Sequence, residues 1–177
     1  YALFKQQKYN AAITQFQKIT EMTTTAIASV RADAYNRIGD SYLNMRNYDE
    51  ANANYAAAKA TDHTMGDYSM LQQAYIEGLR GNYDKKVDLI NQMNAEYPTS
   101  SQAAKALYEQ GRAYVLSGKE DEAAAVFSSI SIRYPGSEYA KKAGEELANM
   151  AANIAIQDSI AAAQDSIATE TAKAPVV

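Results

Sequence analysis

The sequence contains no cysteine at all. A chain without thiols forms no disulfide, has no thiolate nucleophile and offers no cysteine ligand to a metal. It also contains a single histidine, His63, and one histidine without cysteine is too few for an ordinary zinc site. We therefore expect no metal centre and no cofactor, and we expect His63 to be a surface turn residue.

Other absences exclude further classes of function. No apolar run approaches the ~20 residues that a membrane-spanning helix needs. The segment GLRGNYDKK (78–86) has neither the spacing nor the ending of a phosphate-binding loop. The formal net charge is −4 and no basic cluster occurs, which disfavours nucleic-acid binding. Carboxylates are scattered rather than paired for acid–base chemistry, so we expect a protein that is not an enzyme.

The residues that are present favour helices and a core. Apolar residues make up 47% of the 177 residues, alanine is abundant, and only three prolines occur. The chain is long enough for one compact domain or one short repeat array.

Internal repetition is the main signal. The loops KYNAA (8–12), RNYDEA (46–51), GNYDKK (81–86) and GKEDEA (118–123) resemble one another, and each joins two helix-length segments. The tetrapeptides YPTS (97–100) and YPGS (134–137) recur in the same way. Proline ends a helix and serine caps the next one, so these turns separate units of a helical solenoid. Periods of about 35 to 39 residues with two helices each are typical of such arrays.

The units resemble tetratricopeptide repeats. The unit from Ala32 matches through Tyr35, Ile38, Gly39, Tyr42, Ala51, Tyr55 and Ala58, and the unit from Ala104 through Leu107, Gly111, Tyr114, Ala123, Phe127 and Pro135. The unit from Asp67 matches at Ala74, Ile90 and Pro98, but Glu77 and Lys86 stand where a large apolar residue and a small residue are expected. The resemblance implies an all-α superhelix in which Gly39 and Gly111 let paired helices approach closely.

Nine helices are expected, near 1–7, 9–21, 30–45, 48–61, 67–80, 83–96, 100–117, 120–133 and from 138 onward. Segment 21–29 is expected to be a connector. Repeats lie near 1–28, 32–65, 67–100 and 104–137, the first of them truncated because Tyr1 falls inside its first helix. A cap helix from 138 completes an array over residues 1–150, and residues 151–177 form a helical extension and a disordered tail (169–177).

The extension contains a sequence that repeats after seven residues, QDSIAAAQDSIATE (157–170). Ile156, Ile160, Ala163 and Ile167 form a stripe with heptad spacing. One interpretation is a frayed, alanine-rich helical extension, since two heptads fall short of a coiled coil. The other is a helix that binds a partner or a second copy of the chain.

The resemblance places the binding surface on the concave face, formed by the first helix of each unit. Tyrosine and arginine there are the residues that protein interfaces favour. The candidate partner-binding residues are Asn36, Asp40, Tyr68, Tyr75, Lys105, Tyr108 and Arg112. An alternative for Tyr75 is a rotated helix, with Tyr75 in the core and Glu77 turned outward.

These features predict a non-catalytic scaffold that binds a protein or an extended peptide. The ninth positions of the units hold Asp40, Tyr75 and Arg112 rather than asparagine, which disfavours binding of chaperone tails by a carboxylate clamp. The long units, the Tyr-Pro-x-Ser turns and a composition rich in Asn, Gln and Tyr resemble bacterial envelope members of the family, of the Tol-Pal-associated and outer-membrane-assembly lipoprotein type. This resemblance implies a periplasmic or outer-membrane-associated protein, and a cytoplasmic protein is the alternative. The alternatives are a self-association module that uses the C-terminal helix and a site for a glycan on Tyr68 or Tyr108.

Overall fold

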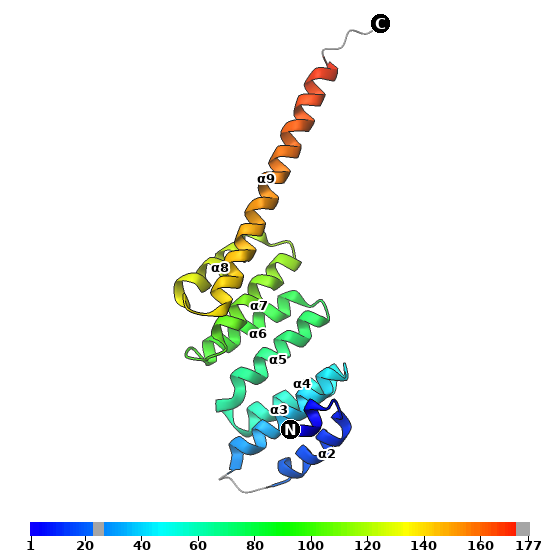
Figure 1. Ribbon diagram of the computed structural model, residues 1–177. Coiled ribbons are helices and arrows are strands. Elements are labelled where there is room, and N and C mark those ends of the chain that lie inside the picture. The colour runs from blue at the N-terminus through cyan, green and yellow to red at the C-terminus, as the bar shows by residue number, and fades with distance from the viewer. Residues whose placement is uncertain (23–26, 173–177) are drawn as a thin grey trace.

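The computed structural model describes residues 1–22 and 27–172. Within these ranges there are nine α-helices and no strand, so the all-α prediction is confirmed (Figure 1). The helices are α1 (Ala2–Lys5), α2 (Tyr9–Thr20), α3 (Ala28–Asn44), α4 (Tyr48–Thr61), α5 (Gly66–Leu79), α6 (Tyr83–Glu96), α7 (Ala103–Leu116), α8 (Glu120–Arg133) and α9 (Glu138–Ala172), with the 3-10 helix η2 (His63–Met65) before α5.

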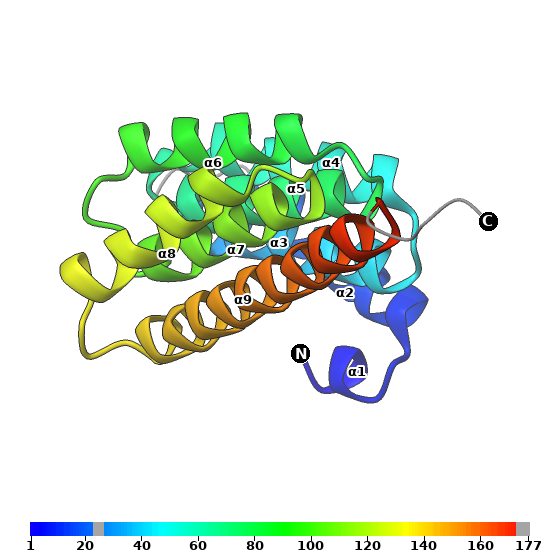
Figure 2. The same cartoon turned by 90° about the horizontal axis from the view of Figure 1, so that it is seen from above.

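The helices pair into antiparallel hairpins that stack into a solenoid. Helices α3 and α4, α5 and α6, and α7 and α8 pack against each other as pairs, and each second helix packs against the first helix of the next pair. Helices α5, α7 and α9 also contact one another in sequence along one side. Figure 2 shows α4 and α6 on the opposite side of the stack from α9. The first helices α5, α7 and α9 therefore line one side of the stack (Figure 2), which is the side that the family resemblance predicts to be the concave face.

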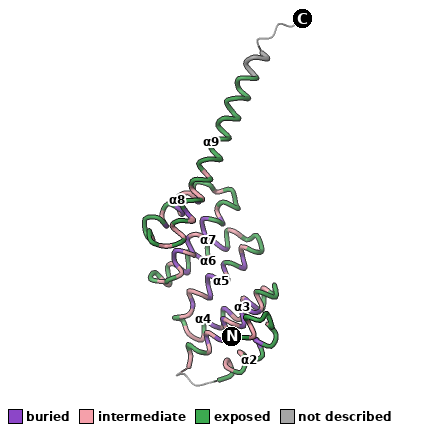
Figure 3. Tube along the Cα trace, in the orientation of Figure 1, coloured by how far each residue is buried: buried purple, intermediate pink, exposed green. Residues whose placement is uncertain are grey.

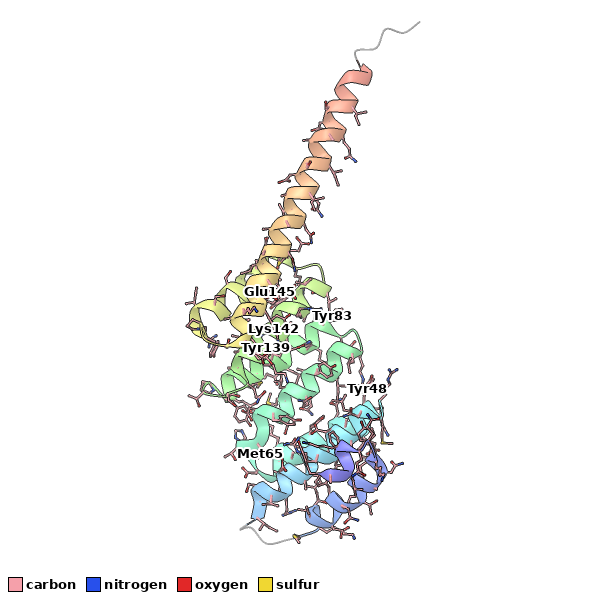
Figure 4. All side chains as sticks on the ribbon, viewed as in Figure 1. Tyr48, Met65, Tyr83, Tyr139, Lys142 and Glu145 are labelled. Carbon is pink, nitrogen blue, oxygen red and sulfur yellow. The ribbon has the colours of Figure 1, made fainter. Side chains whose placement is uncertain are left out.

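Each hairpin turn contains one residue with a left-handed backbone. Gly81 and Gly118 have φ of 77° and 73°, and Arg46 at the matching place has φ of 60°. Glycine adopts this conformation without the steric penalty of a side chain. In RNYDEA, GNYDKK and GKEDEA the motif thus begins with the left-handed residue, two positions after the first helix ends. In RNYDEA the next residue, Asn47, caps α4 by accepting the N–H of Glu50. Tyr48 and Tyr83 then open α4 and α6 (Figure 4).

Close helix packing occurs at the two predicted glycines. A Cβ on Gly39 would lie 2.7 Å from the Tyr55 ring, and one on Gly111 would overlap the Phe127 ring. Tyr55 and Phe127 are fully buried. Each aromatic ring therefore fills the space that the glycine of the facing helix leaves free.

The two Tyr-Pro-x-Ser turns differ in detail. Ser137 directly precedes α9, and its hydroxyl accepts the N–H of Ala140 at 3.1 Å, as expected of a cap. The Ser100 hydroxyl accepts the N–H of Gln102 at 3.0 Å within a turn, and α7 begins only at Ala103 rather than near residue 100. Ser100 also donates to Asp67 at 2.6 Å, so this turn is tied to the start of α5.

Helix α9 begins inside the array and then leaves it. Its first turns pack on α7 and α8 through Ala143, Leu147 and Met150. Beyond them the helix projects from the body, and residues 151–167 are exposed (Figures 1 and 3). The expected tail is helical as far as Ala172, while residues 173–177 lie outside the described part of the chain, as do residues 23–26 of the expected connector. The division of the chain at residue 150 stays a prediction, because α9 runs through that point without a break.

Candidate protein-interaction groove

Two candidate residues at the N-terminal end of the concave face are buried. Asn36 is 1% exposed, and its Oδ1 accepts the Ser69 hydroxyl at 2.9 Å. Asp40 is 7% exposed, and its carboxylate is fully engaged by neighbouring side chains. Neither side chain is open to a partner, so their assignment to the binding surface is corrected: they hold α3 to α4 and α5.

Asp40 is the centre of a hydrogen-bond network between two repeats. Its Oδ1 accepts the hydroxyls of Tyr55 and Tyr68, each at 2.8 Å, and its Oδ2 accepts from Arg37 at 2.7 Å. The Arg37 guanidinium also lies 5.3 Å from the centre of the Tyr68 ring. Burial, together with the Asp40 charge, raises the pKa of Tyr68 above its ordinary value. Tyr68 is thus at the concave position that the repeat pattern assigns to it, but its hydroxyl is occupied.

The C-terminal end of the face is covered by α9. The Tyr108 hydroxyl donates to Glu146 at 3.0 Å, and Arg112 reaches the same carboxylate oxygen at 3.2 Å. The Tyr108 ring also packs against Tyr139, with centroids 5.8 Å apart. Figure 4 shows Tyr139 on the first turns of α9, where that helix lies against the body. Tyr108 and Arg112 therefore bind the chain's own last helix, and Arg112 remains partly exposed.

Between these two ends the face is open. A hollow of about 280 Å³, here named the α5–α7 hollow, is lined by Leu71, Gln72, Tyr75, Lys105 and Glu109. Tyr75 is 43% exposed, whereas Glu77 is 2% exposed, so the alternative in which Tyr75 enters the core is wrong. The structure thus brings two of the candidate residues, Tyr75 and Lys105, to one accessible place.

The two charged residues that line the hollow, Glu109 and Lys105, differ in their ion pairing. The Glu109 carboxylate forms an ion pair with Lys86 at 2.5 Å. In residues 1–22 and 27–167 the Lys105 ammonium forms no ion pair, although its charge acts at longer range on Glu138. The hollow therefore offers one cation without a direct partner, beside the exposed ring of Tyr75.

The third repeat accommodates the two residues that depart from the repeat pattern, Glu77 and Lys86. Glu77, in place of an apolar residue, accepts from Asn82 at 2.8 Å and from Lys85 at 3.0 Å. Burial alone would raise the pKa of Glu77, but these hydrogen bonds outweigh it and hold the pKa below its ordinary value. Lys86, in place of a small residue, fits because the facing residue is Gly78, whose Cβ would lie 2.9 Å from the lysine chain.

His63 lies on the surface in η2, with Nε2 3.5 Å from a Glu96 oxygen. The Tyr97 hydroxyl of YPTS donates to the His63 carbonyl at 2.9 Å, so the turn between α6 and α7 is tied to the turn before α5. Across the part of the chain that the structure describes, no three potential ligands gather into a metal site, and no helix is long and apolar enough to span a membrane.

Two stretches of the chain match family models described as tetratricopeptide repeat, residues 32–62 and residues 105–137. They coincide with the two units whose repeat residues are most regular. No curated protein sequence matches the chain. The family resemblance is therefore supported over the second and fourth repeats.

Similar solved structures have the same fold. The crystal structure of TPR-like repeats of a Podosopora anserina protein described as a kinesin light chain is 15% identical, with a TM-score of 0.66 over 98% of this chain and 93% of that one. A single-substitution form of that protein gives a TM-score of 0.67 at 15% identity, covering 98% of this chain and 92% of the other. The N-terminal domain of stress-induced protein-1 from C. elegans is 17% identical, with a TM-score of 0.56, and covers 67% of this chain and 95% of that domain. At these identities the likeness shows the fold, an α-solenoid of the tetratricopeptide type.

Proposed function

We propose that this chain is a non-catalytic scaffold that binds a partner protein, or an extended peptide segment of one, in the α5–α7 hollow. The observation that carries the proposal is that Tyr75 and Lys105 both line one open hollow of the concave face. Tetratricopeptide repeats and a solenoid fold agree with a protein-interaction role. Both ends of the same face are occupied by contacts within the chain.

The chemistry of the hollow indicates what a bound segment would carry. Tyr75 provides the exposed apolar contact, since Leu71 in the same lining is buried, and an aromatic ring at an interface gives a large contact area at low entropic cost. Lys105 lacks a direct counter-charge, whereas Glu109 already has one in Lys86. A segment with an apolar side chain close to a carboxylate complements this surface.

The test is capture of partners by the tagged chain from the source cells, compared with the double variant Tyr75→Ala/Lys105→Ala. The matched control is Ile132→Ala/Lys18→Ala, which removes one exposed apolar side chain and one exposed lysine from the second helices α8 and α2. We expect the wild type and the control to retain the same protein and the hollow variant to lose it while keeping its circular dichroism spectrum. Retention of the protein by all three would refute the hollow as the site.

We also propose a bacterial cell-envelope setting, periplasmic or associated with the outer membrane. The support is the resemblance of the Tyr-Pro-x-Ser turns to envelope members of the repeat family, together with the absence of cysteine, which suits an oxidising compartment. Fractionation of the source cells, with detection of the native protein by antibody, tests this. Recovery in the cytoplasmic fraction alone would refute it.

A further inference from the structure

The projecting part of α9 carries a row of exposed isoleucines. Ile156, Ile160 and Ile167 are 57%, 52% and 62% exposed, although isoleucine is among the residues most often buried. Their spacing of four, then seven, places them with Ala163 on one face of a helix. We call this face the isoleucine seam. It lies on the segment of α9 that stands clear of the body (Figure 1).

The borders of the seam are uncharged. Helical geometry places Gln157 and Gln164 along one side of it and Ser159 and Ser166 along the other. The acidic residues of this segment, Asp158 and Asp165, fall on the opposite face. Because like charges along a seam oppose pairing, a seam with uncharged borders can approach an identical seam without repulsion. Glutamine both donates and accepts hydrogen bonds, so it can pair with another glutamine.

We propose that the isoleucine seam of one chain packs against the same seam of a second copy, with the two helices antiparallel. In that orientation Ile160 of each chain lies opposite Ala163 of the other, so a large and a small side chain meet in both central layers. Ile156 lies opposite Ile167 of the second copy. A parallel pair would set alanine against alanine and leave a gap in the seam, which forfeits packing.

The shape of the molecule agrees with the antiparallel arrangement. The folded body lies at one end of α9 only (Figure 1). Residues 151–167 span about 25 Å at 1.5 Å per residue. Antiparallel helices place the two bodies at opposite ends of the seam, so that neither body obstructs the other. The α5–α7 hollow is remote from the seam in sequence and is not part of this interface.

A seam of about two heptads is short, so we expect a weak, reversible dimer. Sedimentation velocity over a concentration series measures it, with the full 177-residue chain as wild type, Ile160→Asn and Ile154→Asn. Ile154 is a matched control because it is 50% exposed but lies on the opposite face of the same helix. We expect concentration-dependent dimers for wild type and Ile154→Asn and a monomer for Ile160→Asn. A wild type that stays monomeric throughout, or a loss of dimer in both variants, would overturn the proposal.

The absence of cysteine permits a direct test of orientation. Ile156→Cys and Ile167→Cys chains, one of them extended by a tag, are mixed and oxidised gently. Antiparallel pairing brings the two different thiols together and keeps identical thiols about 16 Å apart along the axis. We expect the mixed disulfide to form faster than either symmetric one. Preferential formation of the symmetric Ile156→Cys disulfide would show parallel pairing and overturn the proposed arrangement.

Discussion

Lys86 and Glu109 form an ion pair with an Nζ–O distance of 2.5 Å, and this pair joins α6 of the third repeat to α7 of the fourth. Lys86 occupies a position where the repeat pattern expects a small residue. Its side chain crosses the space above Gly78 and reaches the lining of the α5–α7 hollow. The unusual residue of the third repeat, Lys86, thus holds Glu109, which is one of the residues that line the candidate binding site.

The first prediction concerns this ion pair. In Glu109→Gln the Lys86 ammonium, whose side chain is buried, loses its counter-charge. Removing one partner of a buried pair is strongly destabilising, so we expect the free energy of unfolding to fall by about 2–3 kcal/mol, less than for a fully enclosed pair because Glu109 is partly exposed. Urea denaturation measures the change. The double variant Lys86→Met/Glu109→Gln is the control, and it should recover most of the loss; equal stability of the two variants would contradict this explanation.

The second prediction concerns Glu77. Since the pKa of Glu77 is lowered in the folded state, its ionised form stabilises the fold at pH values above the ordinary glutamate pKa, and this contribution is lost as pH falls through the folded-state pKa. Glu77→Gln loses the charge-assisted hydrogen bond from Lys85, so we expect it to be about 1–2 kcal/mol less stable than wild type at neutral pH. The difference should narrow on acidification below about pH 4.5. Urea midpoints measured from neutral pH downward test this, and a difference that stays constant would contradict it.

The third prediction uses two helical glycines as a matched pair. A Cβ at Gly39 would lie 2.7 Å from the buried Tyr55 ring, whereas a Cβ at Gly144 on α9 would meet nothing within 4 Å. We expect Gly39→Ala to cost about 1–3 kcal/mol through overpacking. Gly144→Ala should instead stabilise the chain by about 0.5–1 kcal/mol, because alanine favours a helix over glycine. Thermal or urea unfolding compares the two, and changes of the same sign would contradict the packing argument.

The repeat architecture could be predicted from the sequence because its signals are local. Proline, serine and glycine at fixed intervals mark turns, and Gly39 with Tyr55 marks a close helix pair. Helix α7 begins three residues later than the sequence pattern predicts, because Ser100 caps a turn rather than the helix. The left-handed backbone at the start of the hairpin loops was not predicted: glycine permits it at Gly81 and Gly118, but Arg46 adopts it although its residue type does not indicate it.

The binding site could be predicted only in part, because burial depends on residues distant in the sequence. Asp40 stands at a concave position, but Tyr68 from the next repeat covers it. Tyr108 and Arg112 likewise form hydrogen bonds with Glu146 of α9, which is distant in the sequence. The sequence pattern assigns each residue to a helix face and carries no information about which neighbouring side chain reaches it. Tyr75 and Lys105 come together between these covered ends, and their use by a partner stays a prediction.

The last prediction concerns Tyr68 at alkaline pH. Its hydroxyl donates to Asp40 in the folded state, and burial and the Asp40 charge raise its pKa above the ordinary value. An acid whose pKa is raised on folding stabilises the fold while it is protonated. As the pH rises above about 10, the unfolded chain releases this proton and the folded chain keeps it, so the free energy of unfolding should fall by up to about 1.4 kcal/mol per pH unit for this residue.

Tyr68→Phe should therefore differ from wild type in two ways. At neutral pH it should be about 1 kcal/mol less stable, since Asp40 loses one hydrogen-bond donor but keeps Tyr55 and Arg37. Above pH 10 its stability should fall less steeply than that of wild type. Urea midpoints between neutral pH and pH 11 measure both effects. Tyr83→Phe, at the start of α6 and outside this network, is the control and should keep the wild-type slope; a Tyr68→Phe slope equal to that of wild type would show that the Asp40 hydrogen bond does not control the titration.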